Sequence, residues 1–115
     1  MMSVLRSAGP ARILAHRVQR AQTWWDRCVG LIPRAEIDTD EGMWFSDCSA
    51  IHTFFMRAKI DVLFLDEHGR IIEMRASVPP NRPAVTCSGA KHVVELGAGA
   101  IEKQRIRLGE RIRLE

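Results

Sequence analysis

From residue 42 onward the chain is divided into short apolar runs separated by turn residues, and no run has the length of a typical helix. Runs of this length, bounded by Gly, Pro, Asn and Asp, are typical of β-strands. Successive strands without long helices between them predict a mainly β fold, either an antiparallel β-sandwich or a jelly-roll-like small barrel, with one or two short helices. The runs cover residues 43–45, 51–56, 60–65, 70–76, 92–96 and 111–114.

Turn residues define several of these elements more closely. Residues 66–69 predict a hairpin loop in which Gly69 adopts a positive φ. Residues 60–65 are apolar on both faces and are expected inside the sheet, whereas residues 111–114 alternate and are expected near an edge. Three prolines in residues 78–83 predict an extended loop, and residues 97–99 predict a turn before one helical turn over 100–104.

The N-terminal part gives weaker signals. Residues 1–9 have no clear pattern and are expected to be frayed, while residues 11–20 alternate roughly in polarity and predict a strand, although a helix would also suit them. Thr23 and Asp26 have the spacing of a capping box, so a short helix is expected over residues 24–29. Gly30 and Pro33 would end that helix.

Composition limits the class of protein. A chain of 115 residues, 46% of them hydrophobic, predicts one domain, with no run near the roughly 20 apolar residues that a membrane span requires. The net charge is +3, but the basic residues are scattered among 14 acids, so nucleic acid is an unlikely partner that the charge alone does not exclude. Three cysteines form an odd set, which favours reduced thiols and a cytoplasmic location.

Several local patterns follow one another in a specific order. They are RCVGL at 27–31, EGMWF at 41–45, HTFFM at 52–56, IDVLFLD at 60–66, VVELGAG at 93–99 and LGE at 108–110. Over about residues 11–114 the chain resembles the family of domain of unknown function 192, also called uncharacterised protein family 0127. The resemblance implies a β-sandwich of jelly-roll type and brings no established activity.

Two thiols and two imidazoles are the donors that a tetrahedral zinc site needs. In a regular strand, however, Cys48 and His52 would lie roughly 13 Å apart, too far to share a metal. Neither a metal nor another cofactor is therefore predicted, and a cysteine–histidine nucleophile built on the same pair stays a minor alternative. The metal-ligand candidates considered are Cys48, His52, Cys87 and His92.

Asp61 is the only acid inside the most hydrophobic run. A carboxylate buried there needs partners, because an unpaired buried charge costs several kcal/mol. Nearby cations or backbone N–H groups of turns could provide them. A structural anchor is the simpler interpretation, and a ligand-binding carboxylate is the alternative.

We expect a binding or accessory module that recognises a small molecule or a protein segment in a shallow cleft. Two alternatives stay open: a metal- or cysteine-assisted hydrolase, and a nucleic-acid-binding regulator that uses the arginines of the terminal segments. The polar residues expected to line the cleft are Arg34, His52, Arg57, Asp61 and Glu95.

Overall fold

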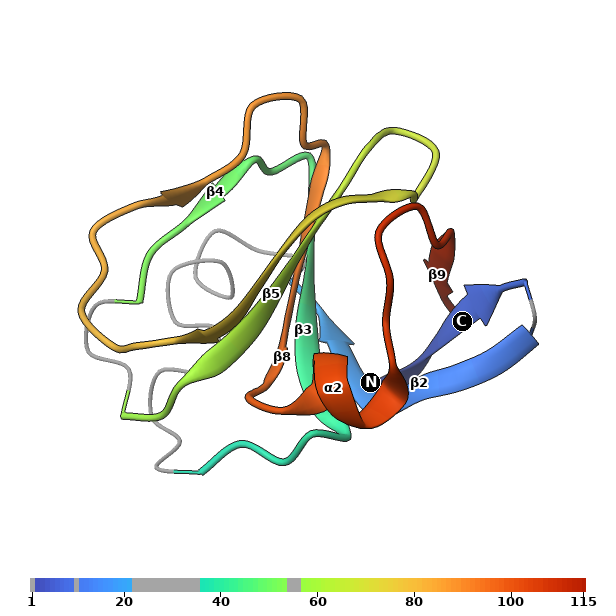
Figure 1. The fold of residues 1–115 in the computed structure, drawn as a ribbon, viewed down its shortest axis with the longest axis horizontal. Helices are drawn as coiled ribbons and strands as arrows, with labels where there is room; N and C mark the ends of the chain where they lie inside the picture. Colours follow the sequence, from blue (N-terminus) through green and yellow to red (C-terminus); the bar gives the residue numbers. More distant parts are fainter. Residues whose placement is uncertain (1, 10, 22–35, 54–56) are drawn as a thin grey trace.

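The computed structural model describes residues 2–9, 11–21, 36–53 and 57–115, and it confirms a mainly β fold (Figure 1). The helix expected over residues 24–29 lies outside the described residues. One short helix follows the eighth strand, as expected. The elements are β1 (Met2–Ala8), β2 (Ala11–Arg20), β3 (Glu41–Ser46), β4 (Ala50–Ile51), β5 (Ile60–Leu65), β6 (Ile71–Val78), β7 (Val85–Thr86), β8 (His92–Gly97), α2 (Ala100–Gln104) and β9 (Ile112–Leu114).

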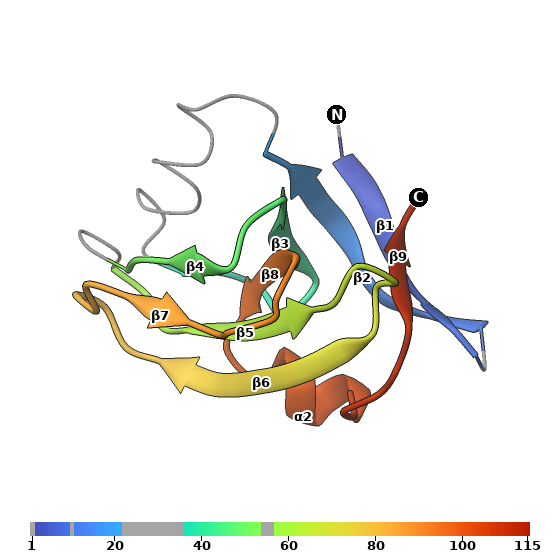
Figure 2. The same cartoon turned by 90° about the horizontal axis from the view of Figure 1, so that it is seen from above.

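The strands form one large sheet and one small one. The large sheet has the order β6-β5-β8-β3-β2-β1-β9, and β4 pairs with β7 in the small sheet. Neighbouring strands are antiparallel except β2 and β3, which run parallel, so the large sheet is mixed. A parallel pair needs a crossover connection, and residues 21–40 provide it. In Figures 1 and 2 the small sheet lies at the opposite side of the molecule from β1, β2 and β9.

The expectation of a frayed N-terminus is wrong. Strand β1 pairs with both β2 and β9, and its Leu5 and Ser7 are buried. The register shifts on both sides of Leu5. Such bulges interrupt the alternation of inward and outward residues, which explains why this stretch shows no strand pattern in the sequence.

The two edges of the large sheet approach each other at one end. The amide of Ile71 donates to the carbonyl of Glu110 (2.9 Å), and the amide of Ile112 donates to the carbonyl of Gly69 (2.9 Å). These bonds join the β5–β6 hairpin to the segment leading into β9. The sheet is therefore curled, with an inward and an outward face.

Each face carries its own hydrophobic core, because side chains alternate along every strand. The inner core is completed by α2 and consists of Leu5, Leu14, Ala15, Val18, Trp44, Leu63, Leu65, Ile71, Val94, Leu96, Ala100, Ile106 and Ile112. The outer core covers the other face and consists of Ala21, Met43, Phe45, Ile60, Val62, Phe64, Val78, Val85 and Val93. The small sheet also packs against this outer core. It does so through Ile51 of β4, Cys48 just before β4 and Cys87 just after β7.

The elements predicted from turn chemistry agree with the structure. Every residue of β5 is buried between β6 and β8, and β9 is an edge strand. Gly69 has φ +81°, and a Cβ there would lie 2.7 Å from the carbonyl oxygen of Ile112. Strand β4 is shorter than the run 51–56 suggested: His52 and Thr53 lie outside it, and residues 54–56 are outside the described residues.

Candidate functional site

Glu95 is a carboxyl group in the middle of the large sheet. It lies on β8, directly between Met43 of β3 and Val62 of β5. Val94 and Leu96 on either side belong to the inner core, so Glu95 faces the outer core, as Val93 does. The residue is 4% exposed, and its Oε2 has no hydrogen-bond partner among the described residues.

Burial alone explains the protonation behaviour of this group. It raises the pKa of Glu95 to about 8, since the charged form loses its hydration without gaining a partner. Glu95 is therefore mostly protonated at neutral pH. A buried acid with a displaced pKa and no structural partner is typical of a functional position.

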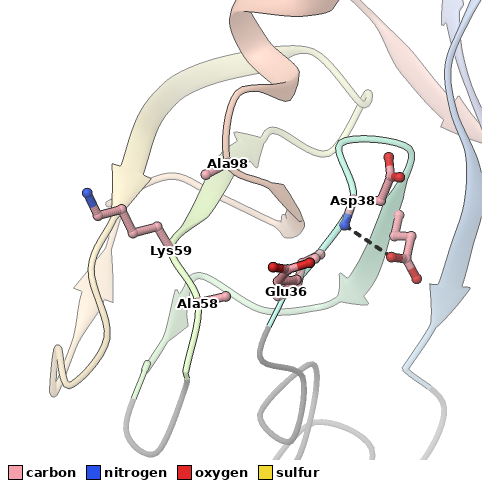
Figure 3. Close-up of a pocket in the computed structure, with 7 residues that line it drawn as sticks. Glu36, Asp38, Ala58, Lys59 and Ala98 are labelled. Atoms are coloured by element: carbon pink, nitrogen blue, oxygen red, sulfur yellow. Dashed lines mark hydrogen bonds between the residues drawn. The ribbon is translucent and has the colours of Figure 1, made fainter.

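A pocket of about 620 Å³ opens at the end of the large sheet where β3 and β5 begin and β8 ends (Figure 3). One wall is the 36–40 segment, which leads into β3. The facing wall is Ala58 and Lys59 before β5, together with Ala98 after β8. The lining residues are Glu36, Ile37, Asp38, Glu41, Ala58, Lys59 and Ala98.

The pocket is acidic although the protein is basic. Its lining holds three carboxylates and one ammonium group, a formal charge of −2, whereas the whole chain carries +3. Glu41 is mostly buried, accepts a hydrogen bond from the amide of Asp38 (3.1 Å) and lies 3.9 Å from the guanidinium of Arg17. Glu36 and Lys59 have no ion pair with another described residue.

Gly97 brings the pocket wall close to the sheet. The 36–40 segment crosses β8 at this position, and a Cβ on Gly97 would collide with the carbonyl oxygens of Ile37 and Asp38. Because these are backbone atoms, they cannot rotate away as a flexible side chain would. The absence of a side chain at position 97 is therefore a condition for the pocket.

We expect Gly97→Ala to destabilise the protein by about 1 to 3 kcal/mol, the usual range for overpacking. The measurement is the urea midpoint, with Gly9→Ala as control, because a Cβ at Gly9 meets nothing within 4 Å. Equal midpoints for the two variants would mean that the 36–40 segment shifts freely.

Glu95 lies one step inward from the pocket on the same face of the sheet. Gly97 pairs with Ile60 and adjoins Glu41, and this row borders the pocket. Met43, Glu95 and Val62 form the next row. Two residues along a strand span about 6.6 Å, so the backbone of Glu95 lies one row from this border, and Glu95 is not among the residues that line the pocket.

The cleft residues expected from the sequence are not gathered in one place. Asp61 pairs with Leu96 and faces the inner core, whereas Glu95 faces the outer core. His52 and Arg57 are exposed, beyond β4 and before β5 respectively. Arg34 lies outside the described residues.

Asp61 is held by backbone groups. Its Oδ1 accepts a hydrogen bond from the amide of Ser77 (2.8 Å), and its Oδ2 accepts from the amides of Gly99 (3.1 Å) and Ile101 (2.9 Å). One buried carboxylate thus connects β5 to the end of β6 and to the start of α2. These contacts are those of a structural anchor.

The cysteine and histidine candidates do not form a metal centre. Within the described ranges, no three His, Cys, Asp or Glu side chains are grouped to hold a metal ion. The thiol of Cys48 donates to the carbonyl of Ala50 (2.9 Å), and burial together with Glu73 raises the pKa of the Cys87 thiol. His92 lies against Trp44, with ring centroids 5.5 Å apart. A raised pKa is the opposite of what activates a thiol, so Cys87 is not an activated nucleophile.

The profile of the DUF192 family, described as "Uncharacterized ACR", matches residues 4–114. The chain belongs to this family. The match begins inside β1, which agrees with the position of that strand in the sheet. The resemblance found in the local motifs is thereby confirmed.

Relatives extend this result. A UPF0127 protein of Thermococcus sibiricus is 34% identical over 64 residues, which cover 56% of this chain and 41% of the relative, so this chain spans less than half of that protein. A solved structure from Sinorhizobium meliloti 1021, described as a candidate transcription regulator, has a TM-score of 0.85 at 21% identity and covers 99% of this chain and 94% of that one. A protein of unknown function from Novosphingobium aromaticivorans DSM 12444 has a TM-score of 0.82 at 20% identity over 96% and 83% of the two chains. At such identities the two structures show the fold of the DUF192 protein alone.

Sequence reasoning missed the acidic wall of the DUF192 pocket. Glu36 and Asp38 lie just before β3, and Glu41 is its first residue. Four acids within residues 36–41 are a local excess in a basic chain, and this excess was the available signal.

In the described part of the chain, no helix is long and apolar enough to span a membrane.

Proposed function

We propose that this DUF192 protein is a binding module for a small organic cation. The observation that carries the proposal is the pocket at the end of the large sheet, whose lining holds three carboxylates and one ammonium group. Its volume of about 620 Å³ lies in the usual range for small-molecule sites. The negative charge of the pocket lining therefore favours a cationic ligand.

The electrostatics favour a cation over a polyanion. A phosphate-rich ligand would meet Glu36 and Asp38 at the entrance, and like charges in a recess repel strongly because water screens them poorly there. An amine or guanidinium would instead gain the charge-assisted hydrogen bonds that exposed carboxylates offer. In Figure 3 the Lys59 side chain extends away from Glu36 and Asp38, so its ammonium group does not face their carboxylates.

A binding role agrees with the state of the thiols. The described cysteines, Cys48 and Cys87, are both free, and burial raises the pKa of the Cys87 thiol. Free thiols support a reducing compartment, so a cytoplasmic location is part of the proposal. A cysteine-assisted hydrolase has no comparable support.

The test is titration with organic cations, followed by calorimetry. Putrescine, agmatine and choline represent the proposed class, and citrate represents anions. We expect at least one cation to bind, with an affinity that falls as salt is added, and citrate not to bind.

Glu36→Gln is the informative variant, since Glu36 is exposed and has no ion pair within the described structure. Loss of one exposed charge contact should weaken binding roughly two- to fivefold. Glu67→Gln, in the β5–β6 loop, is the matched control and should bind normally. Unchanged affinity in the Glu36 variant, or no cation binding at all, would exclude this pocket.

A further inference from the structure

We propose a second binding site, at the end of β6, which takes a small monocarboxylate with a short apolar body. The site is a pocket of about 350 Å³ that shares no lining residue with the acidic pocket. Its described lining holds two arginines and no acid, a formal charge of +2. This basic pocket is lined by Arg75, Ala76, Ser77, Val78, Pro79, Arg82, Ala84 and Val85.

One part of the lining is a bulge near the end of β6. Between two paired positions, β6 has residues 76 and 77 where β5 has only Asp61. An extra residue bends a strand, and such bulges are common beside functional sites. The amide of Ser77 donates to the buried Asp61 carboxylate (2.8 Å), and Ser77 has φ +52°, a conformation that few non-glycine residues adopt. The Asp61 anchor therefore holds the bent end of β6 in the shape that lines the pocket.

The loop that joins β6 to β7 forms the rest of the lining (Figure 2), and buried Thr53 fixes it. The amide of Thr53 donates to the carbonyl of Arg82 (2.9 Å), and its hydroxyl accepts from the amide of Arg82 (2.7 Å). The Thr53 hydroxyl also donates to the carbonyl of Pro79 (2.9 Å), and its carbonyl accepts from the amide of Asn81 (2.8 Å). The backbone that carries Arg82 is thus in place before a ligand arrives, which lowers the entropic cost of binding.

The two arginines differ in the charge that they can offer to a ligand. Arg75 Nε donates to the Glu73 carboxylate (2.6 Å), and its Nη2 donates to the carbonyl of Thr86. The Arg75 guanidinium also lies 5.2 Å from the centre of the Phe64 ring, so it is held in one position. Arg82 is exposed, and its guanidinium has no hydrogen bond or ion pair with another described residue. Arg82 is therefore the group that is available to pair with an anion.

This balance of charge favours a monoanion. Glu73 compensates Arg75, which leaves a formal +1 for the ligand, and the extra carboxylates of a polyanion such as citrate would stay unmatched. A carboxylate fits the planar fork of a guanidinium with two parallel hydrogen bonds. Val78 and Val85 are buried apolar residues of the same lining, and they suit a short alkyl body next to the carboxylate.

The experiment is titration of the isotope-labelled, unmodified protein with butyrate at low salt, followed by the amide shifts in heteronuclear NMR spectra. Butylammonium has the same body with the opposite charge, and inorganic phosphate is an anion without an apolar body. We expect butyrate to shift the amides of Ser77 and Arg82 until they saturate. Butylammonium should not shift these amides, and phosphate should bind there more weakly than butyrate.

Arg82→Gln is the decisive variant, and its exposed side chain makes it suitable because the fold does not depend on it. Loss of both the charge and the fork should weaken butyrate binding at least about fivefold. Arg82→Lys keeps the charge without the fork and should weaken binding less, about two- to threefold. Arg107→Gln, at an exposed arginine before β9, is the matched control and should bind normally.

Each contrary result overturns a stated part of the proposal. No saturable shift at Ser77 and Arg82, or equal affinity of Arg82→Gln and the unmodified protein, would exclude this site. Phosphate binding as tightly as butyrate at the same amides would overturn the ligand class. Glu36→Gln should bind butyrate normally, because the acidic pocket takes no part, so failure here leaves the cation site untouched.

Discussion

Replacing Glu95 with glutamine is expected to remove a pH-dependent loss of stability. The folded protein holds the Glu95 pKa at about 8, while the unfolded chain has the ordinary value of 4.5. Between these values the folded state binds more protons than the unfolded state, so stability falls as pH rises. The contribution of Glu95 is complete below about pH 4.5 and is lost as pH passes through about 8.

The expected size is large for one side chain. Each pKa unit corresponds to about 1.4 kcal/mol, so the shift predicts roughly 3 to 5 kcal/mol of stability lost between about pH 4 and pH 9. A glutamine of the same shape cannot ionise. Its free energy of unfolding should change much less over this range and should exceed that of the unmodified protein above about pH 8.

Urea midpoints of the unmodified protein and the Glu95 variant, taken at about pH 5 and about pH 9, measure this difference. The other titrating groups contribute equally to the stability of both proteins, so their contributions cancel in the comparison. Glu102→Gln on the exposed side of α2 is a suitable control, since it makes the same substitution at a residue exposed to solvent. Parallel pH profiles for the Glu95 variant and the unmodified protein would show that Glu95 ionises freely.

The second large effect is expected at Asp61. Asp61→Asn replaces one carboxylate oxygen with an NH₂ group, which must then face a backbone donor at Ser77 or at the start of α2. Charge-assisted bonds are lost, and a buried N–H is left without an acceptor. We expect about 1 to 3 kcal/mol of destabilisation, and more for Asp61→Ala, which leaves all three amides unmatched.

The check is a lowered urea midpoint with an unchanged slope. An Asp61 variant as stable as the unmodified protein, or more stable, would contradict the anchor. The two acids therefore predict opposite results: a neutral replacement should stabilise at position 95 in alkaline conditions and destabilise at position 61.

Much of the local structure was predictable because its causes are local. The span of β5 follows from six consecutive residues that tolerate burial on both faces. The turn at Gly69 and the helical turn after Gly99 follow from residues that accept a positive φ. Strand β1 was missed because bulges around Leu5 remove the alternation on which strand prediction depends.

The sequence by itself determined the mainly β class, the strands β3, β5, β6, β8 and β9, and the need of Asp61 for buried partners. It also placed Glu95 among the candidate binding residues. Only the tertiary structure decided that Asp61 and Glu95 face opposite cores, because pairing of Asp61 with Leu96 and of Val62 with Glu95 sets the register across β5 and β8. The acidic pocket likewise depends on Gly97, which lets the 36–40 segment cross β8 and brings together residues far apart in the chain. Register and close backbone approach are properties of the packed sheet, and no local pattern of residues encodes them.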